Sequence, residues 1–140
     1  SSEQNELFQK KARSLGVDAQ ILSNLNSIEM CAIFRNARAV IGFSHGEAFG
    51  LTPVEAMAIG TPPLFVDFGG YTDTIVDGVN GRLLRRGDLE AWKKAFEQAK
   101  DEETRESWAR EGATRIQQLG LTPESHVDRL QESIDQITTR

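Results

Sequence analysis

The sequence predicts an α/β fold: a Rossmann-like, doubly wound parallel sheet, incomplete with about four strands, followed by C-terminal helices. Three observations support this prediction. Short apolar runs alternate along the chain with longer segments whose apolar residues recur at helical spacing. The short runs are apolar throughout, as in strands that are buried on both faces. Glycine and proline mark many of the boundaries between the segments.

The first third of the chain supplies two helices and two strands. Residues 4–15 are predicted as a helix that ends at Gly16, a residue typical of helix ends. The apolar run from Ala19 to Leu22 is expected to be a short strand. Ser27 is expected to cap a second helix, whose apolar positions fit a 3.6-residue period. Residues 39–43 (AVIGF) are predicted as a buried strand.

The remaining elements follow from the same signals. They are a helix opened by Thr52-Pro53 and closed by Gly60, a strand over 63–66, a short helix or turn over 71–77, a strand over 82–84 and a helix from Asp88. Trp92 and Phe96 are expected in the core, as is Cys31. Two further helices are expected over 102–119 and 122–138. The apolar stripe of the last helix either packs on this domain or docks on a partner domain.

Composition excludes several classes of protein. The 140 residues carry a formal net charge of −5, which argues against a nucleic-acid partner. No apolar run approaches the roughly 20 residues of a membrane span, and the polar start of the chain lacks the apolar core of a signal peptide. We therefore expect no direct membrane span and a cytoplasmic location. One cysteine, Cys31, excludes an internal disulfide and a cysteine-based zinc site.

The loop after the 39–43 strand has the features of an anion site. Gly46 and Gly50 let the backbone bend and approach a ligand, and a helix begins just beyond, at Thr52-Pro53. Helix N-termini offer unpaired N–H groups and a partial positive charge, and ligands of parallel sheets bind at the carboxyl ends of the strands. A phosphate near the amides of residues 49–52 is therefore expected. No Lys or Arg occurs from Ala39 to Gly81.

Two carboxylates flank this helix start, Glu47 in the loop and Glu55 in the helix. Both can face one crevice, where they would accept hydrogen bonds from sugar and ribose hydroxyls. Each also has a structural interpretation. Thr52-x-x-Glu55 is a capping-box pattern, in which Glu55 would bond to the backbone instead. Glu47 could equally be a solvated loop acid, and the neighbouring His45 is expected to be a surface histidine.

Two sequence segments carry a resemblance to a known family. GEAFGLTPVEAMAIGTPPL, at residues 46–64, is followed by GGYTDTIVDGVNGRLL at residues 69–84. Together they resemble the C-terminal, donor-binding domain of retaining glycosyltransferases of family 4, which have the GT-B fold. The resemblance covers about residues 5–100, and the combined motif is specific. It departs from the family at Asp73, where glutamate is usual.

The resemblance implies roles for individual residues. Glu47 would be catalytic, since it would contact hydroxyls of the donor hexose and stabilise the positive charge that develops at the anomeric carbon. Glu55 would bind the ribose hydroxyls. The sugar and diphosphate would be received by the backbone of Phe49, Gly50, Leu51 and Thr52. The nucleotide base would lie beside Ser23, Asn24 and Leu25. The motif requires no metal and no cofactor.

The resemblance also implies a domain plan. Residues 1–120 would be a partial Rossmann-like domain that binds a nucleotide sugar, such as a UDP- or GDP-hexose. Residues 121–140 would form a C-terminal helix that docks on an N-terminal domain, which would hold a sugar or lipid-linked acceptor. The family's Arg/Lys pair, which faces the diphosphate, has no counterpart between residues 39 and 81.

Two functions follow from this plan. The first is the donor-binding part of a retaining enzyme that transfers a hexose to a hydroxyl acceptor, with this chain alone inactive. The alternative is a non-catalytic nucleotide-sugar-binding or assembly module of the same fold.

Overall fold

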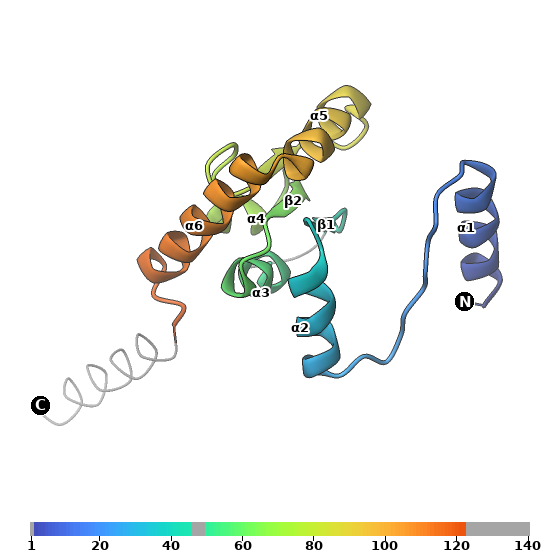
Figure 1. Cartoon of the computed structure of the whole chain (residues 1–140), viewed down its shortest axis with the longest axis horizontal. Helices are drawn as coiled ribbons and strands as arrows, with labels where there is room; N and C mark the ends of the chain where they lie inside the picture. The colour runs from blue at the N-terminus through green and yellow to red at the C-terminus, as the bar shows by residue number, and fades with distance from the viewer. Residues whose placement is uncertain (1, 46–49, 123–140) are drawn as a thin grey trace, which may run out of the picture. The chain divides into compact units, whose positions relative to one another are not determined.

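The computed structural model describes residues 2–45 and 50–122 (Figure 1). The chain divides into two compact units, Ser1–Met30 and Cys31–Arg140. The first unit contains α1 (Ser2–Ser14) and the start of α2 (Ser27–Asn36). The helix predicted over residues 122–138 falls almost entirely outside the described residues.

The sequence predicts that Ser27 caps the second helix. In the structure Asn26 caps the beginning of α2 instead. The Glu29 N–H donates to Asn26 Oδ1 at 3.0 Å, and the Asn26 N–H donates to Glu29 Oε2 at 2.8 Å. This reciprocal pair is a capping box, which satisfies two N–H groups at the helix start. Asn and Ser are similarly good caps, so composition alone did not distinguish the two neighbours.

The predicted strand at Ala19 to Leu22 is wrong: residues 17–23 form no helix or strand. A strand exists only through hydrogen bonds to a neighbouring strand, and a four-residue apolar run specifies no such neighbour. The described part of the chain therefore contains three strands, where about four were expected.

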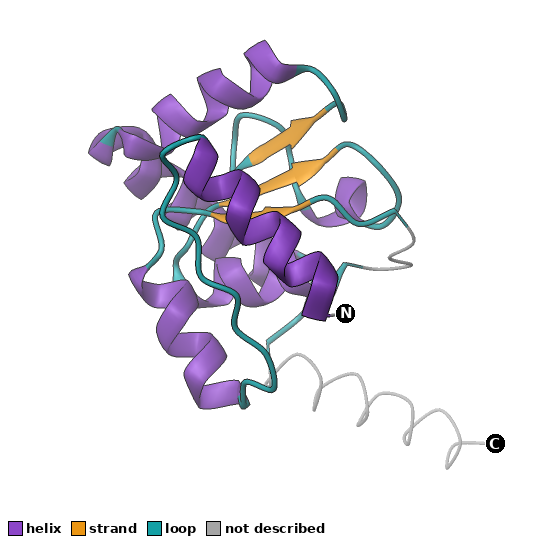
Figure 2. Ribbon diagram, turned by 90° about the vertical axis from the view of Figure 1, so that its right-hand side faces the viewer, coloured by secondary structure: helices purple, strands orange, loops and turns teal. Residues whose placement is uncertain are grey.

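The sheet confirms the predicted fold class. Its strands are β1 (Val40–Gly42), β2 (Pro63–Val66) and β3 (Arg82–Leu84), which lie side by side in that order (Figure 2). All pairs are parallel, with Val40 opposite Pro63 and Leu64 opposite Arg82. All four residues of β2, the central strand, are buried, as its unbroken apolar sequence predicts.

Residues of the strands belong to two hydrophobic clusters. One cluster joins Val40, Phe65 and Val66 to Ala56 of α3 (Leu51–Ile59), to Tyr71 of α4 (Tyr71–Thr74) and to Ile75, which directly follows α4. The other joins Leu64 and Leu84 to α5 (Leu89–Lys100) and α6 (Glu102–Gln118) through Trp92, Ala95, Ala99 and Trp108. The sheet is thus covered by helices on both faces.

Of the three side chains expected in the core, only one is buried. Trp92 is buried as predicted, at 6% exposure, but Phe96 is 38% exposed. Cys31 is exposed, so its predicted packing role is wrong. The helical period identifies a shared face, but how far that face is covered depends on which elements pack against it.

Candidate functional site

The start of α3 lies directly after the loop that follows β1. Gly50 is its N-cap residue and is buried, with φ 71° and ψ 65° in the left-handed region. That conformation favours glycine. Among the described residues, no side chain caps this end of the helix. Since Pro53 has no N–H, Leu51 and Thr52 supply the amides of the first helical residues that lack an acceptor within the helix.

Glu55 does not form the capping box that its spacing allows. Thr52 is the second residue of α3 and not its cap, and Glu55 is the fifth residue. Within the described ranges, Glu55 has neither a hydrogen-bond nor an ion-pair partner, and it is exposed. The buried face of the helix consists of Pro53, Ala56 and Met57. The Glu55 carboxylate is therefore available to an external ligand.

The structure describes only some of the other predicted site residues. Glu47 and Phe49 lie outside the described residues, so their predicted roles stay predictions. Ser23, Asn24 and Leu25 lie in the first compact unit. Asn24 has a positive φ of 57°, which asparagine tolerates well. Their predicted contact with a nucleotide base also stays a prediction.

The loops that follow β1 and β2 meet at the carboxyl edge of the sheet. His45 is exposed, as expected, and its ring lies edge-on to Phe68 with a centroid separation of 4.8 Å. Asp73 in α4 is also exposed, and its carbonyl oxygen accepts a hydrogen bond from Arg115 Nη2 at 2.8 Å. Glu55 and Asp73 are thus exposed acidic residues of the two helices that follow β1 and β2.

A cation that the sequence analysis missed reaches this edge. Arg86 Nη2 donates to the carbonyl oxygen of Phe43, at a distance of 3.0 Å and across 43 positions of sequence. Phe43 is the first residue after β1, and Arg86 follows β3. A useful signal was present: Arg85 and Arg86 directly follow a parallel strand, and the ends of parallel strands share one edge.

Two pockets formed by the described residues are relevant to ligand binding. The first, of about 200 Å³, is mostly apolar and is lined by Phe43, Arg86, Gly87, Leu89, Trp92 and Phe96. Its aromatic rings pack on each other, with 4.7 Å between the centroids of Phe43 and Trp92.

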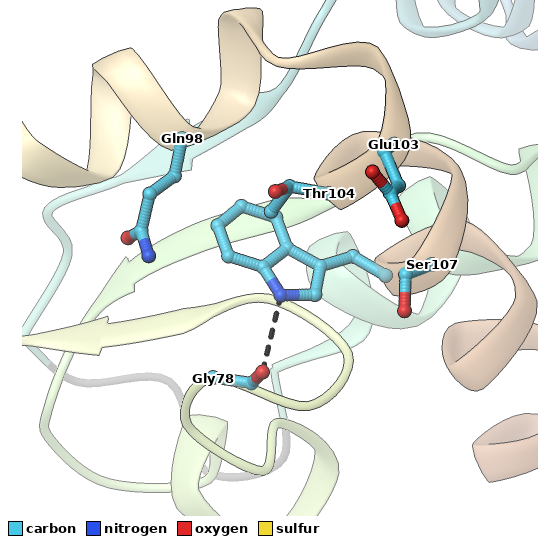
Figure 3. Close-up of a pocket in the computed structure, with 6 residues that line it drawn as sticks. Gly78, Gln98, Glu103, Thr104 and Ser107 are labelled. Atoms are coloured by element: carbon cyan, nitrogen blue, oxygen red, sulfur yellow. Dashed lines mark hydrogen bonds between the residues drawn. The ribbon is translucent and has the colours of Figure 1, made fainter.

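The second pocket, of about 310 Å³, lies where α5 meets α6 (Figure 3). Several of its polar groups already have partners within the chain. Trp108 Nε1 donates to the Gly78 carbonyl at 3.2 Å, Gln98 accepts from Arg82, and Thr104 bonds to Asp101. It therefore offers few free groups to a ligand.

The described part of the chain contains neither a metal site nor a membrane-spanning helix. There, no group of three or more His, Cys, Asp and Glu residues is arranged to hold a metal ion. Over the same residues, no helix combines the length and apolar character that a membrane crossing requires. The expected cytoplasmic location and the expected lack of a cofactor stay predictions.

Comparison with known proteins identifies the family. Residues 1–115 match the family described as Glycosyl transferases group 1. The chain belongs to this family. Similar curated relatives of this glycosyltransferase domain are the D-inositol 3-phosphate glycosyltransferases of Corynebacterium aurimucosum and Corynebacterium kroppenstedtii. They are 34% and 35% identical over 102 and 109 residues, which is 71% and 76% of this chain but 24% of each relative. The chain thus spans about a quarter of their length.

Solved structures agree on the fold. The C-terminal domain of a group 1 glycosyl transferase from Francisella tularensis matches with a TM-score of 0.67 and 24% identity, over 83% of this chain and 62% of that one. Sucrose-phosphate synthase from Thermosynechococcus elongatus matches with 0.75 and 22%, over 98% and 35%. Anabaena HepE in complex with UDP-glucose matches with 0.70 and 23%, over 84% and 33%. These neighbours have the GT-B fold of glycosyltransferases.

Proposed function

We propose that this chain is the donor-binding part of a retaining glycosyltransferase of family 4, which transfers a hexose from a nucleotide sugar to a hydroxyl acceptor. The donor diphosphate binds at the N-terminus of α3. Glu55 accepts hydrogen bonds from the ribose hydroxyls, and Glu47 contacts the hexose. The acceptor binds to a part of the enzyme outside this chain.

One observation carries the proposal. In the described part of the chain no side chain caps the N-terminus of α3, and Glu55, the fifth residue of this helix, is exposed and has no partner there. Free amides and the helix dipole suit a phosphate, while a carboxylate suits ribose hydroxyls. A nucleoside diphosphate offers both groups. The likeness in fold to a protein solved with UDP-glucose supports the same ligand class.

A binding titration tests the donor site. UDP-, GDP- and ADP-glucose are titrated into the chain by ligand-observed NMR, together with the Glu55→Gln and Glu111→Gln variants. Glu111 is an exposed glutamate of α6 and serves as the matched control. We expect one nucleotide to bind saturably and Glu55→Gln to weaken it by about tenfold, because a bond to a charged acceptor contributes about 1.5–3 kcal/mol. Equal affinities for the two variants would contradict the role of Glu55.

Turnover separates the enzyme from the non-catalytic alternative. In a longer enzyme that carries this domain, Glu47→Gln should lower kcat by tenfold or more, with a smaller change in KM, since charge at the anomeric carbon develops in the transition state. The product's anomeric configuration, read by proton NMR, tests retention. Donor binding without turnover in the longer protein would favour the non-catalytic module.

A further inference from the structure

The ring of Phe65 lies against Gly42, and the ring of Tyr71 lies against Gly50. Phe65 and Tyr71 are 1% and 2% exposed, and their centroids are 4.8 Å apart in an edge-on arrangement. A Cβ built on Gly50 would stand 2.6 Å from Tyr71 Cδ1 and 2.9 Å from Cε1. A Cβ on Gly42 would collide with the ring of Phe65. The last residue of β1 and the N-cap of α3 are thus packed on one aromatic pair.

The backbone behind Tyr71 is held from several directions. Tyr71 begins α4, and its carbonyl accepts hydrogen bonds from Ile75 N at 2.9 Å and Thr74 Oγ1 at 3.2 Å. The carbonyl of Thr74 accepts from the buried Asn80 side chain, and that of Asp73 accepts from Arg115. Because α4 is tied to α6 and to the turn before β3, the ring cannot withdraw easily from Gly50.

From this packing we propose that Tyr71 is a positioning residue for donor binding. Its ring sets the position of Gly50 and thereby aims the Leu51 and Thr52 amides of α3 at the donor diphosphate. The inference rests on the proposed function. No Lys or Arg occurs between residues 39 and 81, so amide geometry carries a large share of anion recognition. Hydrogen bonds weaken steeply when their distance or angle is disturbed, so a small shift of these amides lowers affinity.

The competing interpretation is that Tyr71 only fills the core. Ile75 provides a matched comparison, because it is 1% exposed in the same cluster and also belongs to the α4 segment. It is not among the nearest atoms to a Cβ on Gly50. If Tyr71 only filled the core, Tyr71→Leu and Ile75→Ala would both lower stability but would bind the donor with similar affinity. If Tyr71 positions the start of α3, Tyr71→Leu binds the donor more weakly than Ile75→Ala does.

A pair of glycine variants tests the contact from the other side. Gly50 and Gly60 cap the two ends of α3, with φ of 71° and 88°, so alanine is strained at both. Only at Gly50 would the new methyl group meet a side chain, since nothing lies within 4 Å of a Cβ on Gly60. Any excess effect of Gly50→Ala over Gly60→Ala therefore reports the clash with Tyr71.

The experiment records two quantities for the 140-residue chain and each variant. The first is the dissociation constant for the best-binding nucleotide sugar, measured well below each variant's melting temperature. The second is the set of backbone amide shifts and hydrogen-exchange rates of Leu51 and Thr52 without ligand. The variants are Tyr71→Leu, Ile75→Ala, Gly50→Ala and Gly60→Ala.

We expect Tyr71→Leu and Gly50→Ala to bind at least tenfold more weakly than the unmodified chain. Both weak binders should change the hydrogen-exchange rates of the two amides, whereas Ile75→Ala and Gly60→Ala leave them unchanged. Unchanged exchange rates and full affinity in Tyr71→Leu would overturn the inference. If Tyr71→Leu does not fold, the two glycine variants decide.

Failure of the proposed function has a different signature. A folded chain that binds no nucleotide sugar would overturn the donor site itself. The hydrogen-exchange rates of the Leu51 and Thr52 amides would then still decide, without any ligand, whether Tyr71 positions the start of α3.

Discussion

The side chain of Asn80 holds the backbone of Val76: Asn80 Oδ1 accepts the Val76 N–H at 2.8 Å. Asn80 is 1% exposed, and its Nδ2 also donates to the carbonyl of Thr74 at 3.2 Å. One buried amide thus joins the end of α4 to the turn that leads into β3. A buried polar group is stable only when its hydrogen bonds are made, so this turn depends on Asn80.

Asn80→Ala should lower the free energy of unfolding by about 2 kcal/mol, because two backbone groups lose their partner in a buried site. Urea denaturation measures the change. Asn36→Ala is the matched control, since Asn36 also donates to a backbone carbonyl, that of Ala32, but is exposed. An equally small effect of both substitutions would mean that the Asn80 bonds add little to stability.

Gly42→Ala should destabilise the fold by about 1–3 kcal/mol through overpacking against Phe65. The collision is with a ring that is 1% exposed and cannot swing into solvent. The double variant Gly42→Ala/Phe65→Leu should recover part of the loss, because leucine leaves room for the new methyl group. Thermal unfolding of the two single variants and the double variant measures the coupling. Strict additivity would show that the two residues do not interact.

The pKa of the Asp101 carboxyl group is a further property that can be tested. Hydrogen bonds from the hydroxyl and then the backbone N–H of Thr104 hold the pKa of Asp101 below its ordinary value of 3.8. Thr104→Val should raise this pKa, and Thr104→Ser should preserve it. Carboxylate carbon shifts followed by NMR from pH 7 to pH 2 measure both variants. An unchanged pKa in Thr104→Val would assign the shift to the backbone bond alone.

The lowered pKa of Asp101 also predicts the direction in which stability changes with pH. The folded-state pKa of Asp101 is lowered, so its contribution is present above the ordinary value of 3.8 and is lost as pH falls through the folded-state pKa. Thr104→Val should therefore reduce the difference in melting temperature between pH 7 and pH 2. An increase would contradict this sign.

Arg86 should contribute positive potential at the carboxyl edge of the sheet. Arg86→Gln is expected to weaken binding of a nucleoside diphosphate by roughly threefold at low salt and less at high salt, because exposed charges are screened. Arg110→Gln, at an exposed position of α6, is the control. Titrations at two ionic strengths measure both. A loss in Arg86→Gln that does not depend on salt would indicate that its bond to Phe43 matters more than its charge.

Much of the fold could be predicted from local patterns. The apolar run 63–66 became the buried central strand, and the Thr52-Pro53 start and Gly60 end placed α3 within a residue or two. The start of α3 was therefore predictable, as was the exposure of His45. The strand at residues 19–22 was wrong because a short apolar run does not name the strand with which it would pair.

The sequence by itself determined which segments are helices and strands, because caps, breakers and apolar periods act over a few residues. It also carried the motif that the family shares. Only the tertiary structure decided that Glu55 is free of a capping role, that Arg86 reaches Phe43 and that Tyr71 lies against Gly50. The Arg86–Phe43 contact joins residues that are 43 positions apart in the sequence. The Tyr71–Gly50 contact joins residues that are 21 positions apart. Both contacts arise from the way the sheet aligns its strand ends and packs α4 beside α3, which no local period encodes.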